Sequence, residues 1–479
     1  MDSSLFFTIL VLVIGFYMAW NIGANDVSNA MGTSVGSGAL SLRKAVCVAA
    51  VLEFSGAFLA GSNVSETMQK GIIDTDLFLS DPTLLIIGMC SALLGTSAWL
   101  QIASYCGWPV STTHAIVGAI AGFGLVIGGP EAIHWEALSS IGGSWIISPT
   151  LSAFFSYLLF IGLQKKILYA MNPIAATKKL FPGIVFLVFF IFSLSMLFNG
   201  LENLNISLSF TQSFLISFLI GFIAFCISYY FIQKVKVPSD CALTPSTINP
   251  QNVVSLEKAM KHLQRVQSST KDTTHSQVTQ LVKEVKDLSQ ALRKETTLPS
   301  RTSQYTVVEN IFVYLQILSA CFIAFAHGAN DVANAIGPVS AVLDVIKNGA
   351  ISEVAQVPSW LLAFGGIGIV IGLATWGWRV IETIGKKITE LTPTRGFCAE
   401  FGAATTILIA SKMGLPISTT HCLVGAVLGV GLAKGIRAIN LGMLKEIILS
   451  WVITIPSSAV MSIFIFYLLK MFFFHFFTS

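Results

Sequence analysis

The segment GANDVSNAMG at residues 23–32 occurs a second time, almost unchanged, as GANDVANAIG at residues 328–337. A second pair of segments follows in the same order: GWPVSTTH at 107–114 and GLPISTTH at 414–421. Both copies of the second segment continue into Val-Gly-Ala, at 117–119 and 424–426. Two polar, glycine-rich segments repeated in order predict a protein built from two internal repeats.

The composition places these repeats in a membrane. Apolar residues make up 54% of the 479 residues, charged residues only 11%, and the mean hydropathy is +0.76. Apolar stretches near the spanning length predict an all-α polytopic membrane protein with about 10–12 transmembrane segments. Several stretches are interrupted by Gly, Pro, Ser or Thr, so we expect broken or re-entrant helices. The first apolar run lacks a basic region and a cleavage site, and we interpret it as a spanning segment, not a signal peptide.

One stretch breaks the apolar composition. Residues 234–301 contain eleven Lys or Arg and six Asp or Glu, and apolar residues recur there at three- and four-residue spacing, as in two amphipathic helices. We therefore divide the chain into a first membrane repeat at 1–233, a basic soluble loop at 234–304 and a second membrane repeat at 305–479. A solvated helical linker is the main interpretation of the loop, and a regulatory or partner-binding role is the alternative.

The distribution of lysines predicts the orientation. Lys165, Lys166, Lys178 and Lys179 cluster in one short loop, and Lys234 follows two apolar segments later. By the positive-inside rule both loops, and with them the central loop, are cytoplasmic. An odd number of crossings, about seven, between the starts of the two repeats predicts an inverted-topology pair, with a site near the bilayer midplane.

No cofactor and no nucleic-acid partner are expected. The basic charge is confined to the central loop, and the eight cysteines are scattered without a C-x-x-C pair. Such cysteines are typical of small apolar packing residues, not of a disulfide or metal framework.

The first motif predicts a cation site. Its Asn and Asp side chains lie in apolar segments, where they cannot face lipid, and clusters of their oxygens suit small hard cations such as sodium. Helical spacing puts Asn25 and Asn29 on one face, as it does Asn330 and Asn334. Helix capping is the alternative role for these side chains. Two further acids lie in or beside apolar segments, so the candidate cation ligands are Asn25, Asp26, Asn29, Glu53, Asn330, Asp331, Asn334 and Glu400. For Glu53 and Glu400 the alternative is a role as interface residues near segment ends.

The second motif predicts an anion site. Proline followed by Ser-Thr-Thr and a small-residue helix places hydroxyl donors beside the unpaired N–H groups of a helix start. The candidate ligands of one tetrahedral oxyanion are Ser111, Thr112, Thr113, Ser418, Thr419 and Thr420. Ordinary N-capping is again the alternative. For His114 and His421 we weigh structural hydrogen bonding behind the site against proton transfer or contact with the ligand.

The balance of charge suggests the mechanism. Neither motif contains Arg or Lys, so an anion placed near several carboxylates requires a cation to arrive with it. Cation-coupled symport follows as the natural hypothesis, with sodium or a proton as the coupling ion. Asp26 or Asp331 could also accept a hydrogen bond from a protonated oxyanion, which favours hydrogen phosphate over sulfate.

The four motif copies resemble those of the inorganic phosphate transporter (PiT) family, which comprises sodium- or proton-coupled phosphate permeases. The resemblance covers most of residues 1–233 and 305–475, and it implies an inverted-repeat membrane fold, a cytoplasmic central loop and a homodimer in the cell membrane. It also implies a phosphate site made by both Ser-Thr-Thr segments and both Asn-Asp motifs, with alternating access. Glu400 resembles an acidic position of the family's second half, whereas the first half of this chain has Leu93 at the equivalent place.

Four other functions remain as alternatives. A sulfate permease of the same fold is the nearest. An intramembrane phosphatase normally needs Arg or Lys near the developing phosphate charge, which neither motif supplies. A passive channel or a receptor would not need ionisable residues in both halves. We therefore expect a transporter and not an enzyme.

Overall fold

The computed structural model describes residues 3–78, 81–197, 208–235, 250–269, 273–296, 299–349, 357–378, 380–381, 391–435 and 439–477. Within these residues the chain is helical, and its only β pairing is an isolated bridge between Ile73 and Ile133. Eight of the described helices are long and apolar enough to cross a membrane. The predicted all-α, multi-pass membrane fold is confirmed.

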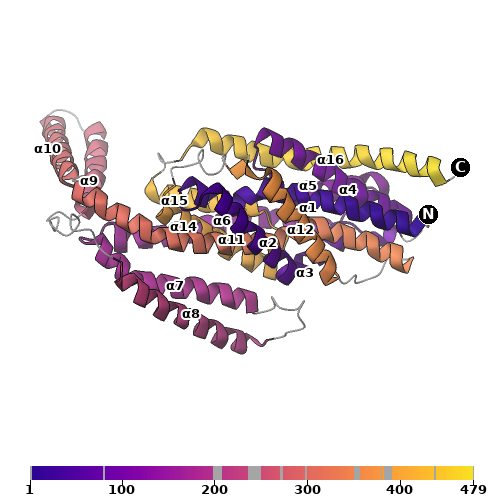
Figure 1. The fold of residues 1–479 in the computed structure, drawn as a ribbon. Helices are drawn as coiled ribbons and strands as arrows, with labels where there is room; N and C mark the ends of the chain where they lie inside the picture. Colours follow the sequence, from indigo (N-terminus) through magenta and orange to yellow (C-terminus); the bar gives the residue numbers. More distant parts are fainter. Residues whose placement is uncertain are drawn as a thin grey trace. The chain divides into compact units, whose positions relative to one another are not determined.

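The helices are labelled in Figure 1. In the first half they are α1 (Ser3–Gly36), α2 (Leu42–Ala60), α3 (Ser62–Lys70), α4 (Pro82–Cys106), α5 (Thr112–Gly128), α6 (Trp135–Leu163), α7 (Pro173–Leu197) and α8 (Phe210–Gln233). The later helices are α9 (Pro250–Ser269), α10 (Thr273–Thr296), α11 (Pro299–Asn348), α12 (Ser359–Trp376), α14 (Pro393–Lys412), α15 (Thr419–Lys434) and α16 (Leu441–Phe477). Short 3-10 turns lie at Thr75–Phe78 and Pro130–Ala132, and a π-helical turn at Gln164–Leu168.

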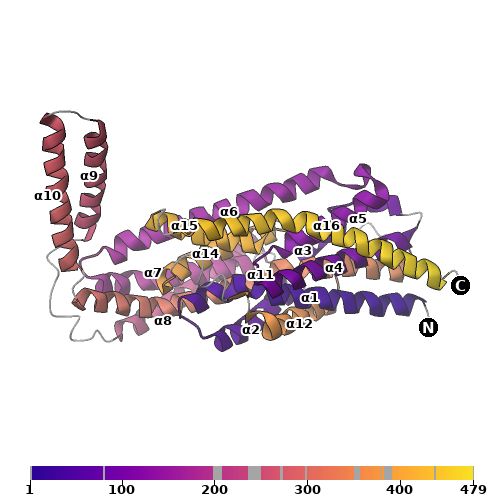
Figure 2. The same cartoon turned by 90° about the horizontal axis from the view of Figure 1, so that it is seen from above.

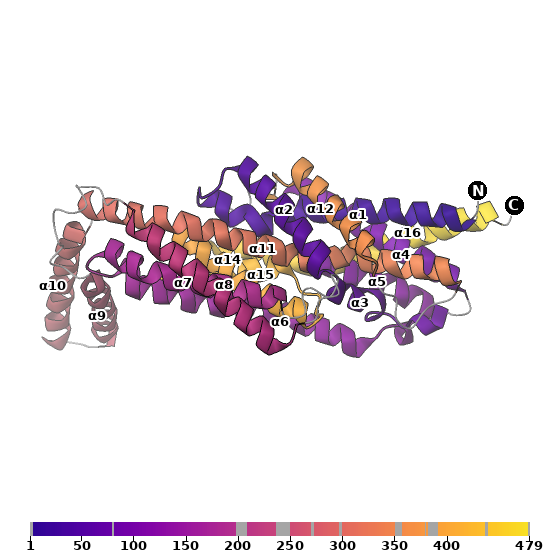
Figure 3. The ribbon, with the colours of Figure 1, turned by 60° about the horizontal axis from the view of Figure 1, so that its bottom comes forward.

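The chain forms two compact units. The first contains residues 1–159, 188–220 and 313–479, and the second contains residues 160–187 and 221–312. In the first unit, α1 packs along α12, α16 packs along α4 and α5, and α14 packs on α15 (Figure 3). In the second unit, α9 and α10 lie side by side as a helical hairpin (Figure 2).

The hairpin corresponds to the two amphipathic helices expected in the basic loop. Both helices are polar on average, unlike the spanning helices. Of the expected loop at 234–304, residues 236–249, 270–272 and 297–298 lie outside the described part of the chain. The division at 233 and 304 therefore remains a prediction.

The helices are interrupted at the two Gly-x-Pro-x-Ser-Thr-Thr segments and not at the two Asn-Asp segments. The Asn-Asp segments lie inside the uninterrupted helices α1 and α11. In contrast, α4 stops at Cys106 before α5 begins, and α14 stops at Lys412 before α15 begins. Gly107 and Gly414 have φ values of 68° and 66°, a left-handed conformation that ends a helix and that glycine adopts without strain. The proline that follows two residues later in each copy has no N–H to continue the preceding helix.

Glycines allow the motif helices to touch their neighbours backbone to backbone. A Cβ atom on Gly23 of α1 would collide with the carbonyl oxygen of Ile369 on α12, and one on Gly328 of α11 would collide with that of Glu53 on α2. The two crossings are equivalent in the two repeats. The second crossing brings Glu53 against the Asn-Asp motif of the other half.

Candidate functional site

The starts of α5 and α15 form one side of the site. Ser111 and Ser418 are the N-caps, and the hydroxyl oxygen of each accepts the backbone N–H three residues on, at 3.2 Å. The predicted helix starts are therefore present. The two serines also cap these helices, which was the alternative role considered for them. Each serine hydroxyl keeps one proton to donate, and the first-turn N–H groups have no partner within the helix.

The threonines that follow connect the two repeats. The Thr113 hydroxyl donates to the Ile417 carbonyl at 2.9 Å, and the Thr420 hydroxyl donates to the Val110 carbonyl at 3.2 Å. Each threonine thus reaches the residue before the Ser-Thr-Thr segment of the other copy. The two helix starts are held together by reciprocal hydrogen bonds, so their donors converge.

The Asn-Asp motifs contact these helix starts crosswise. Asn29 of α1 donates to Thr420 at 2.8 Å, and Asn334 of α11 donates to Thr113 at 3.2 Å and to Thr112 at 3.3 Å. Each motif of one half is therefore bonded to the Ser-Thr-Thr segment of the other half. All of these side chains are at most 2% exposed.

The remaining motif amides anchor the helices that end at the breaks. Asn25 donates to Ser104 at 3.0 Å, and Asn330 pairs with Ser411, also at 3.0 Å. In the amide orientation that its neighbours favour, Asn330 also donates to Asp331 Oδ1 at 2.9 Å. Asn25 and Asn330 thus fix local structure, while their neighbouring aspartates face the site.

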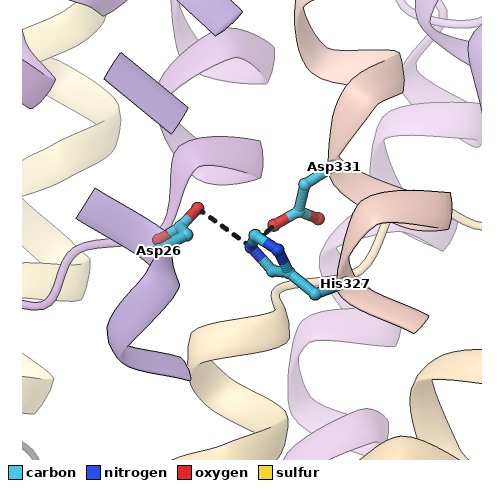
Figure 4. Close-up of side chains that lie close together, drawn as sticks. All are labelled: Asp26, His327 and Asp331. Atoms are coloured by element: carbon cyan, nitrogen blue, oxygen red, sulfur yellow. Dashed lines mark ion pairs between the residues drawn. The ribbon is translucent and has the colours of Figure 1, made fainter. Parts of the chain in front are cut away.

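A histidine that the sequence analysis did not identify lies between the two aspartates (Figure 4). Nε2 of His327, on α11, is 3.0 Å from Asp331 Oδ2 and 3.9 Å from Asp26 Oδ2. Its Nδ1 is 3.4 Å from Glu53 Oε1. The three carboxylates and the imidazole are all at most 1% exposed. Asp331 also accepts the Thr419 hydroxyl at 2.8 Å, and Asp26 accepts Asn29 at 3.2 Å.

The structure separates Glu400 from this cluster. Glu400 accepts hydrogen bonds from Thr33 and Ser34 of α1 at 2.6 Å each, and from Ser319 of α11 at 2.5 Å. Gln316 donates to it at 3.3 Å. Thr33 is seven residues beyond Asp26 on one helix, which corresponds to about 10 Å along the axis. The candidate cation ligands therefore fall into two groups.

The paired histidines of the second motif pack edge to face behind the helix starts. The rings of His114 and His421 have centroids 4.3 Å apart, and each packs on a tryptophan, at 3.8 Å on Trp145 and at 3.5 Å on Trp451 respectively. His421 Nδ1 lies 3.4 Å from the Trp145 carbonyl oxygen. These contacts agree with a structural role behind the site.

Two signals in the sequence point to what was missed. His327 immediately precedes the second GANDV motif, and the corresponding residue of the first copy is the apolar Ile22. The partners of Glu400 follow the first motif in α1 or precede the second motif in α11, so none of them lies inside a repeated segment. His327 and the partners of Glu400 therefore stand where the two halves of the sequence differ.

The site as a whole offers neutral donors on one side and carboxylates on the other. Hydroxyl and N–H groups converge at the two helix starts, which suits an oxyanion. Buried carboxylate and amide oxygens lie around His327 beside the helix starts, and a second group of carboxylate and hydroxyl oxygens lies around Glu400. Such oxygens suit a cation. The arrangement fits the joint binding of an anion and a cation.

Comparison with known proteins agrees with this chemistry. Residues 22–462 match the model of the phosphate transporter family. The chain is 45% identical to inorganic phosphate transporter 2-1, chloroplastic, of Arabidopsis thaliana, over 94% of this chain and 70% of that one. It is 42% identical to a putative phosphate permease of Chlamydia trachomatis, over 96% and 98% of the two chains. A solved sodium-dependent phosphate transporter superimposes with a TM-score of 0.78 at 35% identity, over 97% of this chain and 99% of that one.

Proposed function

This chain belongs to the phosphate transporter family, and from that premise we propose that it is a cation-coupled phosphate symporter that works by alternating access. The family is one of transporters and not of enzymes, so the intramembrane phosphatase is set aside. The coupling ion is sodium or a proton. The relative of known structure is described as sodium-dependent, which supports sodium as the first ion to test.

The observation that carries the proposal is the crosswise bonding of the motifs. Asn29 bonds to Thr420 and Asn334 to Thr113, so the phosphate donors of each half are fixed by the cation motif of the other half. Phosphate binds between the starts of α5 and α15, where Ser111, Thr112 and Ser418 have hydroxyl protons to donate and Thr112, Thr113, Thr419 and Thr420 supply first-turn N–H donors. The hydroxyls of Thr113, Thr419 and Thr420 donate to phosphate only after leaving Ile417, Asp331 and Val110. A shift of one half relative to the other changes both sites together, which is what coupled transport requires.

Charge explains why a cation accompanies the phosphate. Neither Arg nor Lys occurs in the two motifs, whereas Asp26, Asp331 and Glu53 are buried beside them. A doubly charged phosphate in this position would be repelled by the carboxylates unless cations neutralised part of the charge. Asn29 and Asn334, whose buried amide oxygens have no partner among the described residues, add oxygens to this first cation site, while Asn25 and Asn330 hold the adjacent helix ends in place.

Glu400 forms a second cation site in this scheme. Its carboxylate is surrounded by three hydroxyl groups and one amide, all of which carry oxygen atoms that can turn toward a bound ion. The equivalent position of the first half is Leu93, so this site exists once per chain. Two separate cation sites favour more than one coupling ion per phosphate.

We place the protein in the cell membrane, with the central loop in the cytoplasm as the lysine distribution predicts. The two repeats have opposite topology in this proposal. A homodimer is proposed from the resemblance to the family alone.

The test is uptake of labelled phosphate into proteoliposomes of the purified protein, with a sodium gradient or a proton gradient imposed separately. Accumulation driven by sodium alone identifies sodium as the coupling ion, and accumulation driven only by protons assigns that role to Glu53, Glu400 and the buried histidines. Sulfate is added as a competitor, because potent competition would favour the sulfate permease. A failure to accumulate phosphate under either gradient would refute the proposal.

A further inference from the structure

We propose that Asp26, His327 and Asp331 form a binding site for one transition-metal dication, of the class of Zn²⁺ and Co²⁺. The site lies at the contact of α1 with α11, and Figure 4 shows the imidazole between the two carboxylates. This proposal concerns equilibrium binding of a metal ion and goes beyond the proposed transport of phosphate with sodium or protons. Transport activity is not needed to test it.

The distances between the donor atoms suit a metal ion. The imidazole Nε2 and one oxygen of each carboxylate all lie within 4.8 Å of one another. Nε2 is 3.0 Å from Asp331 Oδ2 and 3.9 Å from Asp26 Oδ2. In a tetrahedral site with bonds of about 2.1 Å, donor atoms are about 3.4 Å apart. The two observed distances bracket that value, so small side-chain adjustments are enough to admit the ion.

Two of the three donor atoms have no hydrogen-bond partner among the described residues, and the third, Asp331 Oδ2, accepts the Thr419 hydroxyl at 2.8 Å. Asp26 Oδ2 and His327 Nε2 are buried and make no hydrogen bond of acceptable geometry with any described residue. The contact of 3.0 Å between Nε2 and Asp331 is therefore close but not directed as a hydrogen bond. Buried polar atoms without a partner are costly, and a bound ion would satisfy both.

Glu53 supplies the interaction that metal-binding histidines usually have on their second nitrogen. Its Oε1 lies 3.4 Å from Nδ1 of His327. A carboxylate at this position holds the proton on Nδ1 and leaves the Nε2 lone pair for a metal. The crossing at Gly328 brings the Glu53 backbone against α11, so this carboxylate is positioned by the fold.

The residue types select the class of metal. Imidazole is a good ligand for zinc and other late transition metals, whereas magnesium and calcium favour sites made of oxygen alone. Three protein ligands leave a fourth position open for water or a phosphate oxygen. In the first repeat the residue equivalent to His327 is Ile22, and Ile369 occupies the place of Glu53. The first repeat therefore has no equivalent of this site, the described part of the chain contains a single such cluster, and we expect one ion per chain.

The experiment is a titration of the purified full-length protein with Co²⁺, whose visible absorption reports its ligands. The protein is held in detergent micelles in phosphate-free buffer, with any polyhistidine tag removed. We expect one saturable site per chain, from which Zn²⁺ displaces Co²⁺ and an equal concentration of Mg²⁺ does not. The control H134Q removes an exposed histidine outside the site and should bind Co²⁺ as the native protein does.

Two variants of His327 make the assignment specific. H327Q should weaken Co²⁺ binding by more than about tenfold. H327C should keep a metal ligand and add a thiolate-to-cobalt charge-transfer band in the near ultraviolet, which general destabilisation cannot produce. Absence of saturable binding, native affinity in H327Q, or bound Co²⁺ without the thiolate band in H327C would each overturn the proposal. Phosphate uptake is measured separately, so the metal site can fail while the transport proposal stands.

Discussion

At the scale of single residues, the two motif aspartates have unequal surroundings. Asp331 accepts the Thr419 hydroxyl and lies 3.0 Å from His327 Nε2, whereas Asp26 accepts Asn29 and lies 3.9 Å from the same nitrogen. The motifs are almost identical in sequence, so this difference comes from their neighbours. It suggests that the two carboxylates do not contribute equally to ion binding.

The first prediction concerns these carboxylates. Asp26→Asn and Asp331→Asn keep the side-chain shape but remove the charge, and a charged hydrogen bond contributes about 1.5–3 kcal/mol. We expect coupled phosphate uptake to fall by about tenfold to a hundredfold in each variant, while the protein stays folded in the membrane. Uptake in proteoliposomes and thermal unfolding of the same preparation measure the two effects.

Asp344→Asn is the matched control, because it makes the same change near the end of α11, the helix that carries Asp331. Asp344 bonds to Asn348 and lies outside both motifs. Uptake should be unchanged in this variant. Native uptake by both motif variants would contradict the site assignment.

The second prediction concerns Glu400. Replacement by Gln puts an NH₂ group where three hydroxyls and an amide now donate, so part of this network loses its acceptor. We expect Glu400→Gln to raise the cation concentration for half-maximal uptake by about tenfold. The apparent affinity for phosphate at saturating cation should change little, because Glu400 is remote from the helix starts.

The dependence of uptake on cation and on phosphate is measured in separate titrations. A variant with altered phosphate affinity and a native cation dependence would assign Glu400 to the anion instead. Glu136→Gln makes the same change at an exposed carboxylate of α6 outside both motifs, and it serves as the control that should keep the native cation dependence.

At the scale of helices, glycine crossings decide which side chains meet. A Cβ at Gly328 would meet the carbonyl of Glu53, and one at Gly23 would meet that of Ile369. The third prediction is that Gly328→Ala and Gly23→Ala force these helix pairs apart and destabilise the protein by about 1–3 kcal/mol. Only Gly328→Ala should also move Glu53 away from His327 and so impair uptake directly.

Gly142→Ala on α6 is the control, since a Cβ there meets nothing within 4 Å. Alanine favours helix more than glycine does, so this variant should be as stable as the native protein or more so. Thermal unfolding in detergent measures all three variants. Equal stability of Gly328→Ala and Gly142→Ala would show that the crossing of α11 with α2 has room for a Cβ atom at Gly328.

At the scale of the whole molecule, hydrogen bonds join the two halves between residues that are three hundred or more positions apart in sequence. The fourth prediction is that Asn29 and Thr420 are energetically coupled through their bond of 2.8 Å. A double-mutant cycle with Asn29→Ala and Thr420→Val should give a coupling energy of about 0.5–1 kcal/mol in unfolding stability.

A second cycle pairs Asn29→Ala with Thr405→Val as control. Thr405 donates within its own helix to Phe401 and makes no bond to Asn29. This pair should be additive within error. Additivity of the first pair as well would mean that the crosswise bonds do not hold the halves together.

The sequence by itself determined the class of the protein and the location of its helix starts. Composition alone required a membrane fold, because so few charged residues cannot cover a soluble surface. The Gly-x-Pro-x-Ser pattern determined where α5 and α15 begin, since a left-handed glycine, a proline without N–H and a serine cap act within a few residues of the chain. The repeated motifs also sufficed to identify the family.

Only the tertiary structure decided which side chains share a site. The Asn-Asp segments remain unbroken helix because their side chains find partners across helices, so the backbone needs no interruption there. The placement of Glu53 beside His327, and of Glu400 among Thr33, Ser34 and Ser319, depends on helix crossings between distant parts of the chain. Local rules cannot predict such contacts, because packing sets them and the repeat pattern does not contain them.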